Sequence, residues 1–208
     1  MNFGFKRTAI AALMTLTSMS ANALLIDNNL YTTDTVSGLD WLDVTLSVNR
    51  SYNDVSSQFG VGGDFEGWRY ATGIEFNDLA GRHTGISATG YNIVDTTGTT
   101  PSTDLLVYLL GSTLDAFSIQ GIGMTYDASI GVAEGEGQDY TLGLLADASD
   151  STGHYRATLL DTEINAFDFY KAHDGALDDT LAMYSSGSFL VRNTLVSSVA
   201  EPTTFPLL

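Results

Sequence analysis

The chain has 208 residues, with 25 acidic side chains against eight lysines and arginines, and a formal net charge of −17. This charge repels nucleic acids and anionic membrane surfaces, which argues against either as a partner. The absence of cysteine excludes disulfides, thiolate metal sites and cysteine nucleophiles. Because 44% of the residues are apolar, with ten tyrosines, ten phenylalanines and two tryptophans, we expect one folded domain.

The first 23 residues have the three-part layout of a secretory signal. Lys6 and Arg7 supply positive charge, residues 8–17 are mainly apolar, and small residues lead up to Ala23. A membrane anchor is disfavoured, because an apolar run of about ten residues is shorter than the roughly twenty that span a bilayer. We therefore predict export, with cleavage after Ala23 and a mature domain over residues 24–193 at the cell envelope surface or outside the cell.

The first half of the mature chain contains strand signals. Residues 24–26 and 30–33 are predicted strands around an Asp-Asn-Asn turn. Residues 35–44 combine a Ser-Gly turn with a strand of alternating side chains. Residues 68–71 also have a strand-like composition.

Start and stop signals predict three short helices, at residues 52–59, 73–79 and 104–110. Ser51 is a candidate N-cap with Asp54 three residues later, and Thr72 repeats this capping-box spacing with Glu75. The polar, glycine-rich residues 82–103 are predicted to form a long surface loop.

Beyond residue 116 the helical period is lost, and strand-like stretches alternate with turns. The predicted strands are residues 117–126, 140–146, 154–160 and 188–191. The sequence therefore predicts a single α+β domain with a strand-rich second half.

Three segments carry a recognisable pattern: D-T-V-S-G-L-D-W-L-D at 34–43, G-W-R-Y-A-T-G-I-E-F at 67–76 and G-S-F-L-V-R at 187–192. They resemble the DUF1566 (Lcl carboxy-terminal) family, whose pattern has T-G-L-x-W, then W-R-L-P-T-x-x-E-L, and a closing strand ending in V-R. The resemblance implies a C-type-lectin-like fold, with two or three short helices flanking a small, twisted, mainly antiparallel sheet. It gives structural roles to the matching positions Asp34, Gly38, Trp41, Trp68, Arg69, Thr72, Glu75 and Arg192.

The chain departs from these relatives in places. Ser37 stands where the family prefers threonine, and Tyr70 and Ala71 replace Leu-Pro. Calcium-dependent lectins bind sugars through E-P-N or Q-P-D together with W-N-D, and none of these motifs is present. The implied fold therefore carries no sugar site onto this chain.

The last ten residues read V-A-E-P-T-T-F-P-L-L and resemble the start of a PEP-CTERM sorting signal. Glu201 and Pro202 match, Ala200 replaces the usual first proline, and the membrane helix and basic cluster are missing. We interpret residues 194–208 as a polar connector and truncated sorting motif; a degenerate tail and a chance Glu-Pro are the alternatives. The implied partner is exosortase-type sorting machinery if the full gene completes the tail, with only transient membrane contact through the missing helix.

Two acidic stretches, D-A-S-D-S-T-G-H at 147–154 and D-G-A-L-D-D at 174–179, place oxygen ligands near glycine, as calcium sites do. The other interpretation is a solvated acidic face. The candidate ligands are Asp147, Asp150, Asp174, Asp178 and Asp179. Calcium is the only cofactor that the sequence suggests.

No catalytic residue is assigned from the sequence. His83, His154 and His173 lack zinc-hydrolase spacing, and we expect them at the surface. No G-x-S-x-G elbow occurs. The tryptophans are expected in the core rather than in a stacking site.

Arg69 follows Trp68 and needs a partner for its charge, which we expect to be a carboxylate such as Asp40 or Asp43. Its alternative role is a bidentate anchor for an acidic glycan. Together, these features favour a non-enzymatic exported protein that binds a glycan or matrix component through its loops. The alternatives are a secreted polysaccharide hydrolase with paired carboxylates and a purely structural matrix protein.

Overall fold

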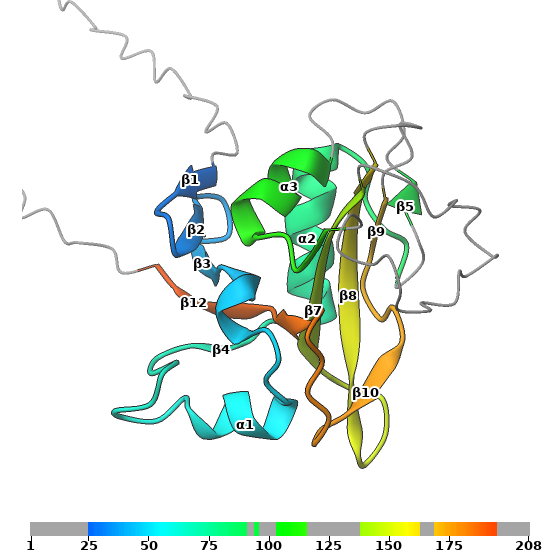
Figure 1. Ribbon diagram of the computed structural model, residues 1–208. Helices are drawn as coiled ribbons and strands as arrows, with labels where there is room; N and C mark the ends of the chain where they lie inside the picture. Colours follow the sequence, from blue (N-terminus) through cyan, green and yellow to red (C-terminus); the bar gives the residue numbers. More distant parts are fainter. Residues whose placement is uncertain (1–24, 91–93, 96–102, 116–137, 163–168, 195–208) are drawn as a thin grey trace, which may run out of the picture.

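The computed structural model describes residues 25–90, 94–95, 103–115, 138–162 and 169–194 (Figure 1). The predicted signal peptide with Ala23, the sorting motif with Glu201 and Pro202, and the predicted strand at 117–126 lie outside these ranges. Within them, no helix has the length and apolar character that a membrane span requires.

The described residues form three α-helices and two sheets, which confirms the predicted α+β class. The first sheet is antiparallel and has the order β1-β2-β3-β12-β4. Its strands are β1 (Leu25–Asp27), β2 (Tyr31–Asp34), β3 (Leu39–Leu42), β4 (Arg69–Tyr70) and β12 (Leu190–Asn193). The four strands predicted in the first half of the chain therefore belong to one sheet.

The second sheet has the order β11-β7-β8-β9-β5, with β10 paired to β8 and β6 paired to β7. The long hairpin of β7 (Gln138–Ala148) and β8 (Gly153–Thr162) dominates it and confirms the strands predicted at 140–146 and 154–160. The shorter strands are β5 (Val94–Asp95), β6 (Leu114–Asp115), β9 (Phe169–Lys171), β10 (Ala176–Asp178) and β11 (Gly187–Ser188). Among the strands that the structure describes, only β11 pairs in parallel.

One segment, residues 187–193, contributes a strand to each of the two sheets, where the sequence predicted one sheet. β11 pairs with β7, and two residues later the same chain enters the first sheet as β12. Between them, Phe189 donates its N–H to the Leu144 carbonyl (3.0 Å) and accepts from the Ala71 N–H (2.8 Å). The Ala71 carbonyl then accepts from the Ala146 N–H (2.8 Å), so backbone hydrogen bonds continue across the junction.

The helices begin where the capping signals predicted. α1 (Tyr52–Ser57) follows Ser51, whose hydroxyl accepts from the Asp54 N–H at 3.2 Å. α3 (Thr103–Leu110) closely matches its predicted range, and a 3₁₀ turn, η1 (Val44–Ser47), follows β3. α2 (Gly73–Thr84) runs past its predicted end at residue 79. The loop prediction was therefore wrong for residues 82–84.

The extension of α2 has a packing cause. Leu79, Ala80 and Thr84 are all buried, so the apolar face of the helix continues to its last turn. The helix stops at Gly85, which adopts the left-handed φ of 74° that favours glycine. Burial therefore extends the helix past Gly81, the residue near which the sequence predicts its end.

The capping box of α2 is confirmed. Thr72 Oγ1 accepts from the Glu75 N–H at 3.2 Å, and Glu75 Oε2 accepts from the Thr72 N–H at 2.9 Å. Glu75 also holds both terminal nitrogens of Arg69, at 2.9 and 2.6 Å. Three family-motif positions therefore join the start of α2 to β4.

Replacing Thr72 with alanine is expected to lower the free energy of unfolding by about 1 kcal/mol, because the N–H of Glu75 loses its acceptor. The Thr72→Ser variant keeps the hydroxyl and is expected to retain most of that stability. Urea unfolding of both variants measures the difference. Equal losses in the two variants would show that the cap is not the cause.

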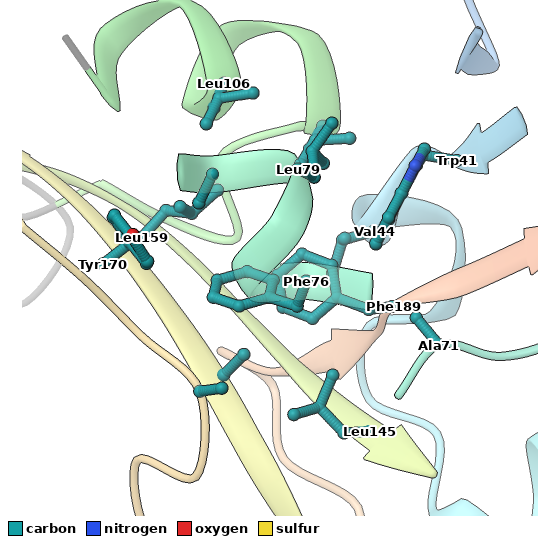
Figure 2. Packing of buried hydrophobic residues seen from close by; sticks show 14 of the residues in the cluster. Trp41, Val44, Ala71, Phe76, Leu79, Leu106, Leu145, Leu159, Tyr170 and Phe189 are labelled. Carbon is teal, nitrogen blue, oxygen red and sulfur yellow. The ribbon is translucent and has the colours of Figure 1, made fainter. Parts of the chain in front are cut away.

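The main core lies where α2 and α3 pack between the two sheets (Figure 2). The Phe76 and Phe189 rings are 5.0 Å apart at its centre, and Trp41 is 1% exposed. A second cluster lies under α1 and the loop after it. Its buried members are Leu42, Val55, Phe65, Tyr70, Leu144 and Leu190. The core prediction is confirmed for Trp41, whereas Trp68 is only half-buried at the margin of the second cluster.

Candidate functional site

The two faces of the first sheet have different surroundings. Trp41 and Val191 point into the main core, whereas Leu42 and Leu190 point into the second cluster. Because side chains alternate along a strand, the register places a further group on the same face as Leu42. These residues are Tyr31, Thr33, Asp40 and Arg192. They lie beyond the buried members of the second cluster. We call these four residues and Trp68 the open-face site.

A guanidinium group lies against two aromatic rings in this site. The Cζ of Arg192 is 4.4 Å from the ring centroid of Trp68 and 4.7 Å from that of Tyr31. The two rings meet edge to face, with centroids 6.2 Å apart. All three side chains are half-buried, so cation–π attraction orders them while leaving part of each at the surface.

A buried carboxylate holds the guanidinium from beneath. Asp40 Oδ2 accepts from Arg192 Nε at 3.0 Å, and the two side chains are 4% and 28% exposed. Asp40 Oδ1 accepts from the hydroxyls of Thr33 (2.7 Å) and Thr194 (3.1 Å). Nη1 and Nη2 of Arg192 have no hydrogen-bond partner in the described part of the chain.

Arg69 has the carboxylate partner that the sequence predicted, but this partner is Glu75 rather than Asp40 or Asp43. Arg69 on β4 lies directly opposite Val191 on β12, and Val191 faces away from Asp40. The Arg69 side chain therefore lies on the opposite face of the sheet from Asp40 and reaches Glu75 on α2. Asp43 instead accepts from the Thr45 N–H at 2.9 Å and caps η1. The partner of Asp40 is Arg192, which is 152 residues away along the chain. The register of β12 between β3 and β4 decides which side chains share a face, and no local pattern in the sequence points to Arg192.

The family-motif residue Asp34 anchors the first sheet to α2. Its side chain is fully buried and accepts from Ser37 Oγ at 2.6 Å, from the Val36 N–H at 3.0 Å and from Arg82. Burial raises the pKa of Asp34, but the hydrogen bonds and the Arg82 charge together outweigh it and lower the pKa below its ordinary value. Gly38, with φ 69°, completes the turn that Asp34 begins. Asp34 is therefore placed as a structural carboxylate.

The five candidate calcium ligands do not form one site. Asp147 accepts from the Gly73 N–H at 2.6 Å and lies 3.2 Å from His173 Nε2. Asp179 Oδ1 lies 2.7 Å from His154 Nδ1. Asp147 therefore connects β7 to the start of α2, and Asp179 connects the end of β10 to β8.

The other three candidate ligands also have protein partners. Asp150 and Asp178 each accept from the N–H and hydroxyl of a threonine two residues later, which lowers their pKa. Asp174 accepts from Thr158 Oγ1 at 2.6 Å and from Lys171 Nζ at 3.2 Å. Among the described residues, no three histidine or acidic side chains gather as a metal site would require.

Two histidines expected at the surface are packed. The ring of His154 stacks on Tyr52 at 3.5 Å, and Tyr52 stacks on Tyr70 at 4.2 Å. His173 stacks on Tyr155 at 4.0 Å. Each histidine side chain is 16% exposed. The surface prediction was wrong for both, because their ring partners come from segments that only the fold brings together.

A small cavity of about 160 Å³ lies beside α2. Its lining residues are Asn77, Asp78, Gly81, Arg82, Ser87 and Ala88. Asp78 is the one carboxylate in this lining, so the cavity does not provide the two opposed carboxylates of a glycosidase. The open-face site is therefore the stronger candidate for recognition.

No family model, curated protein or solved structure matches this chain. The resemblance to the DUF1566 and PEP-CTERM families accordingly stays a prediction from sequence.

Proposed function

We propose that this chain is an exported, non-enzymatic protein of the cell envelope or extracellular matrix that binds a glycan through the open-face site. Export is supported by the signal-like residues 1–23 and the sorting-like residues 199–208. We also propose that the described domain is a DUF1566-like variant of the C-type-lectin-like fold. The antiparallel first sheet and the two capped helices are compatible with that assignment.

The grouping of Trp68, Tyr31 and Arg192 carries the proposal. Aromatic side chains with one apolar and one polar aspect suit a partly wet recognition surface, and a sugar ring offers C–H groups to such rings. The neighbouring hydroxyls of Thr33 and Thr194 add polar groups that could interact with sugar hydroxyls. This combination of a few polar groups around apolar surface is typical of small-ligand sites.

Polysaccharide pull-down with the purified chain tests this function. The chain is expected to be retained on at least one matrix polysaccharide, and Trp68→Leu is expected to reduce retention about tenfold, since a stacking partner is lost. Tyr108→Leu is the matched control, because Tyr108 is 75% exposed on α3 and lies outside the site. Circular dichroism establishes that both variants are folded.

Three results would count against the proposed function. The chain would fail to bind any polysaccharide, Tyr108→Leu would reduce retention as much as Trp68→Leu, or the chain would release reducing ends from the bound polymer. The last result would favour the hydrolase alternative.

A further inference from the structure

We propose that the glycan recognised by the open-face site is an acidic saccharide, whose carboxylate binds the two outer nitrogens of Arg192. This inference rests on the proposed function and specifies its ligand class. Arg192, rather than Arg69, is then the bidentate anchor for an acidic glycan.

The hydrogen bonds of Arg192 leave one edge of its guanidinium for a ligand. A guanidinium has five N–H donors in a fixed fork, and Asp40 accepts from Nε alone. A bidentate pair with Asp40 would have required Oδ1, but Thr33 and Thr194 donate to that oxygen. A carboxylate arriving from the surface can therefore accept from Nη1 and Nη2 without displacing Asp40.

The aromatic rings prepare this edge for binding. Trp68 and Tyr31 contact the guanidinium, and Asp40 holds its inner nitrogen, so less side-chain freedom remains to be lost when a ligand binds. The same rings provide apolar surface beside the carboxylate position. A sugar ring that carries a carboxylate matches both features, whereas a simple anion matches only one.

Other arginines in the described residues are less suited to this role. Arg69 uses both terminal nitrogens on Glu75, and Arg50 uses all three of its nitrogens on Asp54 and Asp64. Arg82 is paired with the buried carboxylate of Asp34. For Arg156, Nε is buried without a hydrogen-bond partner, and no aromatic ring contact is found in the described part of the chain. Among the five arginines of the described residues, Arg192 alone combines unpaired outer nitrogens with two adjacent rings.

The net charge of −17 does not forbid this contact. At physiological salt the Debye length is about 8 Å, so exposed carboxylates farther away than that are largely screened. The interaction at the site is then set by the nearby groups. Of these, Asp40 is already hydrogen-bonded to Arg192 and to two hydroxyls.

The test compares an oligogalacturonate with its fully methyl-esterified form, which differ only in the carboxylate charge and its ester groups. Calorimetric titration at physiological salt is expected to give about tenfold tighter binding of the acid, which corresponds to about 1.4 kcal/mol. Arg192→Gln is expected to remove this preference, and Arg156→Gln is the matched control that keeps it. Asp40→Asn/Arg192→Gln removes both charges of the pair, so that a buried unpaired carboxylate cannot explain the loss.

Each contrary outcome has a separate meaning. Equal binding of acid and ester, or retention of only neutral polysaccharides, would overturn the acidic-saccharide inference and leave the proposed function standing. Full competition by acetate at the same concentration would mean that a carboxylate is bound without its sugar, which also overturns it. A loss of the preference in Arg156→Gln would place the anion site on the second sheet. Failure to bind any polysaccharide would instead overturn the proposed function.

Discussion

Replacing Phe189 with alanine is expected to lower the free energy of unfolding by about 3 to 5 kcal/mol. Phe189 is fully buried and lies at the junction of β11 and β12, where its backbone joins the two sheets. Its ring packs on the ring of Phe76. The Phe189 ring also lies so close to Gly143 on β7 that a Cβ added at Gly143 would be 2.7 Å from it. Truncation would therefore open a cavity between segments whose backbone positions are already set by hydrogen bonds.

Urea unfolding followed by tryptophan fluorescence measures this loss. Phe189→Leu, which keeps part of the buried volume, is expected to be clearly less destabilising, and Tyr108→Ala at an exposed position is expected to change stability by less than about 0.5 kcal/mol. An unchanged unfolding midpoint for Phe189→Ala would show that the two sheets do not depend on this side chain.

The Asp34→Asn variant is expected to lose about 2 to 4 kcal/mol, because Arg82 is then left without its buried counter-charge. We expect a loss toward the low end of the cost of breaking a buried ion pair. The reason is that the Arg82 side chain is 27% exposed, so water can partly solvate it. Asp78→Asn, at an exposed position of α2, is the control and is expected to be nearly neutral. Denaturant unfolding at neutral pH compares the two variants.

The loss caused by Asp34→Asn is also expected to depend on pH. The pKa of Asp34 is lower in the folded state than its ordinary value of 3.8, so the ionised carboxylate stabilises the fold above that pH. As the pH falls through the folded-state pKa, this contribution disappears. The stability difference between the wild type and Asp34→Asn should therefore be largest near neutral pH and shrink in strong acid. A difference that stays constant down to strong acid would contradict an ionised Asp34.

Local signals predicted local structure well. Ser51 and the Thr72–Glu75 pair lie within three residues of the groups that they cap, so their hydrogen bonds could be inferred from spacing. The β7–β8 hairpin followed in the same way from two strand-like stretches around a turn. The end of α2 was missed, because burial against the core, rather than a stop signal in the sequence, decides where that helix ends.

The open-face site could be predicted only in part. The family pattern marked Trp68 and Arg192, but as structural positions, and it did not mark Tyr31 or Asp40 as their neighbours. Their proximity follows from the position of β12 between β3 and β4. That placement depends on pairing between segments at opposite ends of the domain, which no short window of sequence contains.

By itself, the sequence determined the α+β class, the helix starts, the cysteine-free acidic character and the strand-rich second half. These properties depend on composition, side-chain periodicity and neighbours a few residues apart. Only the tertiary structure decided that the strands divide into two sheets joined at Phe189, that Asp40 pairs with Arg192 and that the acidic candidates each have separate partners. The reason is that strand pairing and ion pairing select partners by distance in space, and the fold sets that distance independently of separation along the chain.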